Sequence, residues 1–173
     1  LIEVGMQELK QFVVDIPDFP QPDILFRDIS PLLRRHFAAT IESIEQLFSD
    51  AEWQSVDAVA GIESRGFILA SALAARRGKG FVPVRKKGKL PPPVVDIAYD
   101  LEYGTGVLEM QAGQGRLLLV DDVLATGGTL AASMVLSRQA GYVVQGVGVL
   151  IDIGIAPGFR CEDHVPRIVL QYG

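Results

Sequence analysis

The chain has 173 residues, of which 49% are apolar and 21% charged, and its formal net charge is −5. This length predicts one compact domain with a complete hydrophobic core, and this composition excludes a disordered chain. The negative charge argues against nucleic acid and anionic membranes as partners. No stretch reaches the roughly 18–20 apolar residues of a membrane span, and no targeting segment is expected.

The cysteine content bears on the compartment in which the protein works. Cys161 is the only cysteine, so no intramolecular disulfide can form. We therefore expect a protein of the reducing cytoplasm.

The N-terminal third is predicted to be helical on both sides of a proline-rich loop. Apolar residues at helical spacing predict a helix over Met6–Val14. Three prolines, at positions 17, 20 and 22, forbid a helix over 16–23. Ser30 and Pro31 suit a helix start, and the apolar pattern that follows predicts two helices reaching about Asp50.

Short apolar runs alternate with helical patterns in the rest of the chain. Strands are predicted over Val56–Ile62, Gly80–Arg85, Arg116–Val120, Tyr142–Ile151 and Arg167–Gln171, and helices over Phe67–Ala75 and Leu130–Ala140. Such alternation is typical of an α/β fold with a doubly wound, mainly parallel sheet covered by helices on both faces. Ligands bind such sheets at the carboxyl ends of the strands.

The segment 86–114 interrupts this alternation. It is rich in Lys, Pro and Gly, it lacks a helical period, and Pro91, Pro92 and Pro93 stiffen it. Loops of this length in a compact domain are usually functional. We expect a mobile hood or a hairpin here.

The sharpest chemical signal is Leu118–Thr129, with the sequence LLVDDVLATGGT. Gly127 and Gly128 let the backbone turn tightly and approach a ligand, and the start of the next helix attracts a phosphate. Asp121 and Asp122 offer acceptors for the vicinal hydroxyls of a ribose where the strand bends into the loop. The alternative is a turn with two solvated aspartates. No G-x-G-x-x-G and no P-loop sequence is present, which argues against dinucleotide binding and NTP hydrolysis.

This 12-residue segment resembles the motif with which type I phosphoribosyltransferases bind 5-phosphoribosyl-1-pyrophosphate (PRPP). Asp18–Leu33 and Gly61–Phe67 are similar to stretches of the adenine-specific branch of that family. So are Arg85–Leu90 and Tyr99–Gly104, and all occur in the family's order. The resemblance implies a type I phosphoribosyltransferase fold with a small N-terminal base-binding hood and a flexible catalytic loop at about 86–114.

The resemblance also implies the residue roles. The 5′-phosphate and ribose would be held by Asp121, Asp122, Ala125, Thr126, Gly127, Gly128 and Thr129, and adenine by Leu25, Phe26 and Arg27. The pyrophosphate would be held by Glu63, Ser64, Arg65, Arg85, Lys86 and Lys89, with Lys87 nearby and with Mg²⁺ bound mainly through PRPP. Glu102 would act as general acid or base at the purine N7, Arg65 would assist catalysis, and Tyr103 would pack at the closed site.

Taken without the resemblance, these residues allow plainer interpretations. Phe26 could fill a core, Arg65 could form a surface salt bridge, and Glu102 and the lysines could be solvated. The purine's second face is unassigned, with Ile153 and Ile155 as candidates.

Ala125 favours adenine over a 6-oxopurine as the acceptor base, because phosphoribosyltransferases for 6-oxopurines typically carry an aspartate at this position. Together with this alanine, the family resemblance implies a cytoplasmic, homodimeric enzyme of purine salvage that makes AMP from adenine and PRPP. The alternatives are an enzyme for another base and a PRPP-sensing regulator without catalysis.

Overall fold

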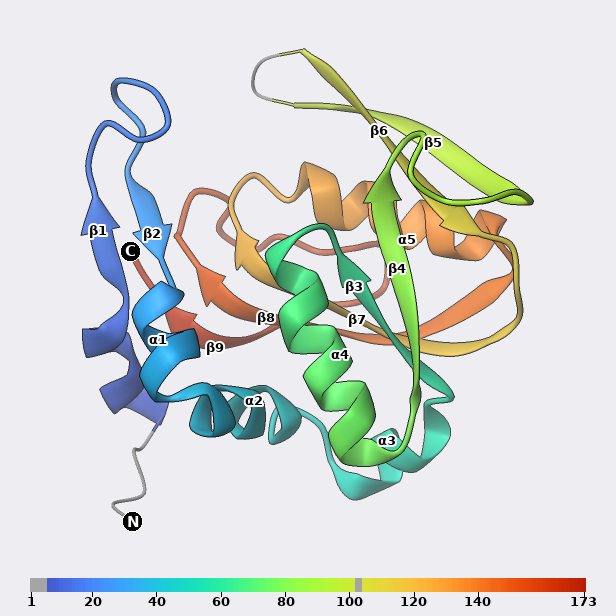
Figure 1. Ribbon diagram of the computed structural model, residues 1–173, viewed down its shortest axis with the longest axis horizontal. Coiled ribbons are helices and arrows are strands. Elements are labelled where there is room, and N and C mark those ends of the chain that lie inside the picture. Colours follow the sequence, from blue (N-terminus) through green and yellow to red (C-terminus); the bar gives the residue numbers. More distant parts are fainter. Residues whose placement is uncertain (1–5, 102–103) are drawn as a thin grey trace.

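The computed structural model describes residues 6–101 and 104–173 (Figure 1). Its helices are the 3₁₀ helix η1 (Met6–Phe12) and the α-helices α1 (Ser30–Arg35), α2 (Phe37–Glu45), α3 (Asp50–Ser55), α4 (Arg65–Arg77) and α5 (Gly128–Gln139). Its strands are β1 (Val14–Ile16), β2 (Phe26–Asp28), β3 (Ala58–Ile62), β4 (Gly80–Lys86), β5 (Val94–Asp100), β6 (Thr105–Gln111), β7 (Gly115–Leu124), β8 (Tyr142–Asp152) and β9 (Arg167–Gln171). Among these residues no helix is both long and apolar enough to cross a bilayer.

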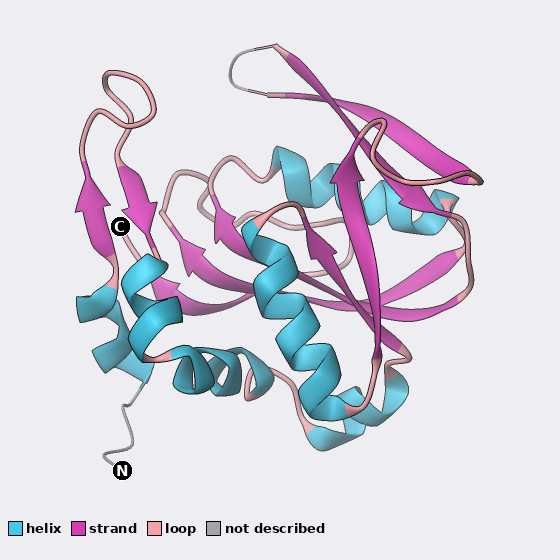
Figure 2. Cartoon of the chain, viewed as in Figure 1, coloured by secondary structure: helices cyan, strands magenta, loops and turns pink. Residues whose placement is uncertain are grey.

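The main sheet has the strand order β5-β6-β4-β3-β7-β8-β9 within the described residues. The strands β4, β3, β7, β8 and β9 run parallel, and β6 joins the edge of β4 in the antiparallel direction. Helix α4 covers one face and α5 the other (Figures 1 and 2). This arrangement confirms the predicted α/β fold with a mainly parallel sheet.

Alternation along β7 separates two cores, one on each face of the sheet. Leu118 and Val120 pack with the helices α1 to α4, whereas Leu117 and Leu119 pack with α5. These side chains are at most 2% exposed. Successive residues of a strand point to opposite faces, so an unbroken apolar run serves both cores.

Several predicted boundaries differ from the structure. The segment 30–50 was expected to hold two helices, but it forms α1, α2 and the start of a third helix, α3. That helix begins where the Ser49 side chain accepts from the Glu52 N–H in a capping box. The helix expected over Met6–Val14 is a 3₁₀ helix that ends at Phe12. The strand expected to end at Val120 continues to Leu124, because its pairing with β8 extends to Asp152.

Two antiparallel hairpins stand beyond the parallel strands (Figure 1). The first pairs β1 with β2, and the second pairs β5 with β6 across the register from Val94–Gln111 to Asp100–Thr105. Of the two forms expected for 86–114, the structure therefore has the hairpin. Both hairpins flank the carboxyl ends of the parallel strands, where a ligand is expected.

Candidate functional site

A loop and a helix start form the first part of the site. Strand β7 ends at Leu124, and α5 begins at Gly128 after Gly127, whose φ is 89°. A cavity of about 80 Å³ lies at this turn, lined by Asp121, Val123, Leu124, Ala125, Thr126, Gly127, Gly128, Thr129 and Leu130. The free N–H groups and positive end of α5 favour an anion in this cavity, which we call the phosphate cradle.

The two aspartates lie inside β7 and not at its end, where they were expected. Asp121 is 7% and Asp122 8% exposed, and Asp121 Oδ1 accepts the Asp122 N–H at 2.9 Å. Burial, followed by repulsion from Asp122, raises the pKa of Asp121 well above its usual range. The pair is therefore a buried acidic group and not the solvated turn that was the alternative.

Arg65, the first residue of α4, connects three parts of the site. Its Nη2 lies 2.7 Å from Asp122 Oδ2, a buried oxygen that accepts no aligned hydrogen bond from the described residues. Its Nη1 donates to the main-chain oxygen of Arg27 at 3.3 Å, and its guanidinium lies 4.8 Å over the ring of Phe26. These contacts replace the surface salt bridge that was the plainer interpretation of Arg65.

Glu63 contacts the residues of β4 and the following turn that are expected to bind pyrophosphate. Its carboxylate pairs with Lys89 Nζ, with Arg85 Nε at 3.3 Å and with the main-chain N–H of Lys86 at 3.0 Å. Burial acts to raise the pKa of Glu63, but these hydrogen bonds lower it to about 2. The Glu63–Ser64 peptide bond is cis.

The chain approaches closely at Gly66, directly after Arg65. A Cβ on Gly66 would lie 2.9 Å from Asp121 Oδ1 and 3.3 Å from the Val120 carbonyl oxygen. Only glycine therefore lets the start of α4 lie against the acidic pair of β7.

The strand β2 carries the residues expected to hold a base. The Phe26 ring meets the Phe19 ring edge-on with centroids 5.1 Å apart, and Leu25 is 48% exposed. Arg27 pairs with Asp15 of β1, and its guanidinium lies 4.2 Å over the ring of Tyr172. Phe26 is thus at the surface of the hairpin, beside Arg65, and not in either core.

The end of β5 lies beside the phosphate cradle. The Leu101 N–H donates to the Gly104 oxygen at 2.8 Å, and the Asp100 oxygen lies 3.3 Å from the position of a Cβ on Gly128. Glu102 and Tyr103, the residues expected to act at the closed site, lie outside the described residues.

Sequence reasoning missed two residues near this site. Phe159, in the loop between β8 and β9, packs on Gly127, where a Cβ would lie 2.1 Å from its ring. Glu109, on β6, is 3% exposed and accepts two main-chain hydrogen bonds from the segment that holds Lys89. A lone Phe or Glu has no motif, so neither could be found before the contacts were known.

The two isoleucines considered for the purine's second face differ in packing. Ile153 packs against the core on the α4 face, and its N–H donates to the Leu124 oxygen at 3.1 Å. Ile155 is 56% exposed. Ile153 is therefore the candidate held in a fixed position beside the end of β7.

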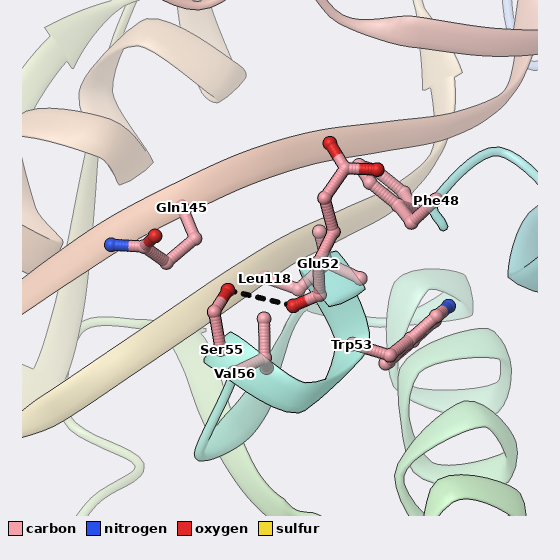
Figure 3. A pocket seen from close by; sticks show the side chains of 7 residues that line it. All are labelled: Phe48, Glu52, Trp53, Ser55, Val56, Leu118 and Gln145. Carbon is pink, nitrogen blue, oxygen red and sulfur yellow. Dashed lines mark hydrogen bonds between the residues drawn. The ribbon is translucent and has the colours of Figure 1, made fainter. Parts of the chain in front are cut away.

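A larger cavity, of about 210 Å³, lies away from this site against the early residues of β7 and β8 (Figure 3). It is lined by Phe48, Glu52, Trp53, Ser55, Val56, Leu118 and Gln145. Glu52 pairs there with Arg167 at 2.5 Å, and Ser55 Oγ donates to the Glu52 main-chain oxygen at 2.7 Å. Glu52, the charged residue of this lining, is neutralised by Arg167, so the lining does not indicate an ionic ligand.

Comparison with known proteins identifies the family of the chain. Residues 32–156 match the model of the phosphoribosyl transferase domain. The adenine phosphoribosyltransferase of Hydrogenovibrio crunogenus is 49% identical over 165 residues, which cover 95% of this chain and 96% of that protein. The crystal structure of the Rhodothermus marinus adenine phosphoribosyltransferase has a TM-score of 0.84 at 41% identity, over 96% of this chain and 97% of that one. The Saccharomyces cerevisiae enzyme, crystallised with an imino-altritol bisphosphate and adenine, has a TM-score of 0.88 at 32% identity, over 95% of this chain and 98% of that one.

Proposed function

The chain belongs to the adenine phosphoribosyltransferases of the phosphoribosyl transferase family, and on that premise we propose that it makes AMP and pyrophosphate from adenine and PRPP in purine salvage. The observation that carries the proposal is the position of Arg65, in contact with both Phe26 and Asp122. A base stacked on Phe26 and a ribose on Asp122 would meet beside this cation, which is where the leaving pyrophosphate has to be bound.

The reaction breaks the bond between the anomeric carbon and pyrophosphate, and it forms a bond from that carbon to the adenine N9. Its transition state should have oxocarbenium character, as in glycoside hydrolysis. Negative charge develops on the leaving group, so the cations Arg65, Arg85 and Lys89 would stabilise it. In the described structure all three are neutralised by carboxylates, and we propose that they exchange those partners for pyrophosphate oxygens.

The remaining roles follow the family resemblance. The cradle of Ala125, Thr126, Gly127, Gly128 and Thr129 would hold the 5′-phosphate, and Asp121 and Asp122 the ribose hydroxyls. The exposed Lys86 and the Glu63–Ser64 peptide would bind pyrophosphate. Leu25 and Arg27 would contact the edge of adenine, and Ile153 its second face. Glu102 would exchange a proton at N7, and Tyr103 would close over the site.

Magnesium is the metal that the family chemistry implies. The described residues contain no group of three acidic, histidine or cysteine side chains that could hold a metal alone. Mg²⁺ commonly keeps several waters and binds substrate phosphates with one or two carboxylates. PRPP oxygens would therefore hold it, with the buried Asp122 Oδ2 as a candidate protein ligand, and it would neutralise charge on the leaving pyrophosphate.

We extend the proposal to a homodimer in the cytoplasm. Ile68 of α4 and Phe81 of β4 are 41% and 39% exposed, and a second copy of the chain would cover such large apolar side chains. Light scattering after gel filtration should give twice the mass of the chain. Phe81→Asp should give the single mass, whereas a single mass for the unaltered protein would refute the dimer.

Release of pyrophosphate tests the activity directly. The protein is mixed with Mg²⁺ and PRPP, and adenine, hypoxanthine, guanine or orotate is added in turn. Release with adenine alone supports the proposal, and release with another base alone changes the acceptor. No release with any base would leave the PRPP-sensing alternative. Glu102→Ala should lower kcat by about 10²-fold or more while PRPP binding persists.

A further inference from the structure

The segment between β4 and β5 is held in place along β6. It begins after Lys86, carries Lys89 and ends with Pro91, Pro92 and Pro93. Proline has no N–H, so the segment's N–H donors all precede Pro91. The Lys87 N–H donates to Val107 on β6 at 3.0 Å, which leaves three N–H groups, those of residues 88–90, to be satisfied.

Glu109 of β6 satisfies these donors. Its Oε1 accepts the N–H groups of Lys89 and Leu90, both at 2.6 Å, and the Gly88 N–H also helps to lower the pKa of Glu109. The residue is 3% exposed. A carboxylate is seldom buried unless donors surround it, and here the donors are the turn that carries Lys89.

The next residues of β6 hold the prolines. Gln111 Nε2 donates to the Pro91 oxygen at 3.1 Å, and the Ala112 N–H donates to the Pro93 oxygen at 3.3 Å. Glu109 itself lies opposite Arg85 in the pairing of β4 with β6. A single strand therefore aligns both Arg85 and the turn at Lys89.

The outcome of this anchoring is the position of the Lys89 side chain. Its Nζ reaches Glu63, which also pairs with Arg85. Glu63 directly precedes the loop expected to wrap the pyrophosphate. The anchor at Glu109 thus brings a cation from a turn outside the parallel strands to the edge where those strands end.

We propose that Glu109 is a positioning residue of the pyrophosphate site, which fixes the turn at residues 88–90 so that Lys89 faces the leaving group of PRPP. The inference rests on the proposed function. Glu109 touches neither substrate in this arrangement; it acts through the main chain of Lys89. Its loss should therefore weaken PRPP and pyrophosphate binding and spare adenine.

Kinetics of three variants test this role. Glu109→Ala should raise the KM of PRPP and the inhibition constant of pyrophosphate by about tenfold, as expected for lost hydrogen bonds to a charged group. The KM of adenine should stay within twofold. Glu109→Gln keeps an Oε1 that accepts both N–H groups and should recover most of the affinity. Asp96→Ala, which removes an exposed carboxylate from the opposite position on β5, should change neither constant.

A double-mutant cycle separates positioning from general support of the fold. If Glu109 acts through Lys89, Glu109→Ala should add little to the effect of Lys89→Ala on the KM of PRPP. Full additivity would overturn the proposal, and so would a KM of PRPP unchanged in Glu109→Ala or in Lys89→Ala. A KM of adenine raised as much as that of PRPP would also overturn it.

Two measurements remain informative without turnover. Calorimetry measures pyrophosphate binding to each variant without any turnover. If the protein proves inactive, the proposed function is refuted, but the effect of Glu109→Ala on pyrophosphate binding still tests the role of Glu109. Hydrogen exchange of a peptide over 85–93 reports only residues 87–90, because the first two residues of a peptide lose their label and the prolines have no amide hydrogen. Faster exchange in Glu109→Ala than in Glu109→Gln, with both variants still folded by thermal unfolding, is the expected result. Equal exchange would overturn the anchor.

Discussion

Arg65 and Asp122 form the ion pair that joins the start of α4 to β7, with 2.7 Å between Nη2 and Oδ2. The same guanidinium lies over Phe26, the residue proposed to stack on adenine. Arg65 therefore has two protein partners that both belong to expected substrate sites. A diphosphate that attracts Arg65 would free the Asp122 carboxylate for the ribose and a face of Phe26 for the base.

Arg65→Gln should lower kcat/KM for PRPP by about 100-fold, because charge-assisted hydrogen bonds to the leaving group are lost. Adenine binding to the protein without PRPP should not weaken, because glutamine leaves the Phe26 ring free. Steady-state kinetics and calorimetry measure these two effects. Arg76→Gln is the matched control on the same helix, since Arg76 pairs with Glu45 outside the site and should leave both values unchanged.

Asp121→Asn should stabilise the fold while it weakens PRPP binding. The pKa of Asp121 is raised in the folded chain, so the folded state binds more protons than the unfolded state above pH 3.8. Its contribution to stability is therefore present at low pH and is lost as the pH rises. Asparagine keeps the oxygen that accepts the Asp122 N–H, but it carries no charge.

Thermal unfolding at several pH values measures the gain. At pH 7 the variant should melt about 2–4 °C higher, as about 1 kcal/mol gives in a chain of this size. Below about pH 4 the gain should vanish. If the variant melts lower than the unaltered protein at pH 7, the charged Asp121 does not destabilise the fold through burial and repulsion from Asp122.

Much of this architecture could be predicted from patterns. The apolar runs of β3, β7 and β8 have the composition of buried parallel strands, and Gly127-Gly128 after an acidic pair indicated the phosphate cradle. The family resemblance supplied Phe26 and the loop at Arg65, which the composition of those segments alone left open.

Long-range pairing could not be predicted. The extension of β7 to Leu124 depends on its register with β8, and the register of a strand depends on its partner as well as on its own residues. A hairpin was one of the two forms expected for 86–114, but the bounds and the register of β5 and β6 could not be predicted. Glu109 and Phe159 are contacts between segments that are distant in sequence, so only the folded chain reveals them.

Glu63→Gln should change stability in a pH-dependent way. The pKa of Glu63 is about 2 in the folded chain against 4.5 in a model peptide, so its ion pairs stabilise the protein above about pH 4.5. That contribution is lost as the pH falls from 4.5 towards 2. Because Arg85 and Lys89 are partly exposed, water screens the pairs and the effect should be modest.

Denaturant unfolding of both proteins between pH 3 and pH 7 measures this difference. The unaltered protein should be more stable at pH 7, and the difference should shrink as the pH falls from 4.5 to 3. A difference that stays constant over this range would show that Glu63 acts without its charge. Glu42→Gln, at an exposed carboxylate 4.0 Å from Arg76, is the control and should give almost no difference at either pH.

Gly127→Ala tests whether the packing of Phe159 on Gly127 supports the phosphate cradle. Alanine is strained at a φ of 89°, and its Cβ would lie 2.1 Å from the Phe159 ring. The substitution should therefore cost about 1–3 kcal/mol of unfolding free energy and raise the KM of PRPP.

The double variant Gly127→Ala, Phe159→Ala distinguishes the two causes. Removing the ring relieves the clash but not the backbone strain, so it should restore only part of the PRPP affinity that Gly127→Ala loses. Full restoration would assign the whole effect to the clash, and no restoration would assign it to the backbone and remove Phe159 from the support of the cradle. Phe159→Ala alone should leave the KM of adenine unchanged, because the ring packs on Gly127, whereas Phe26 packs with Phe19.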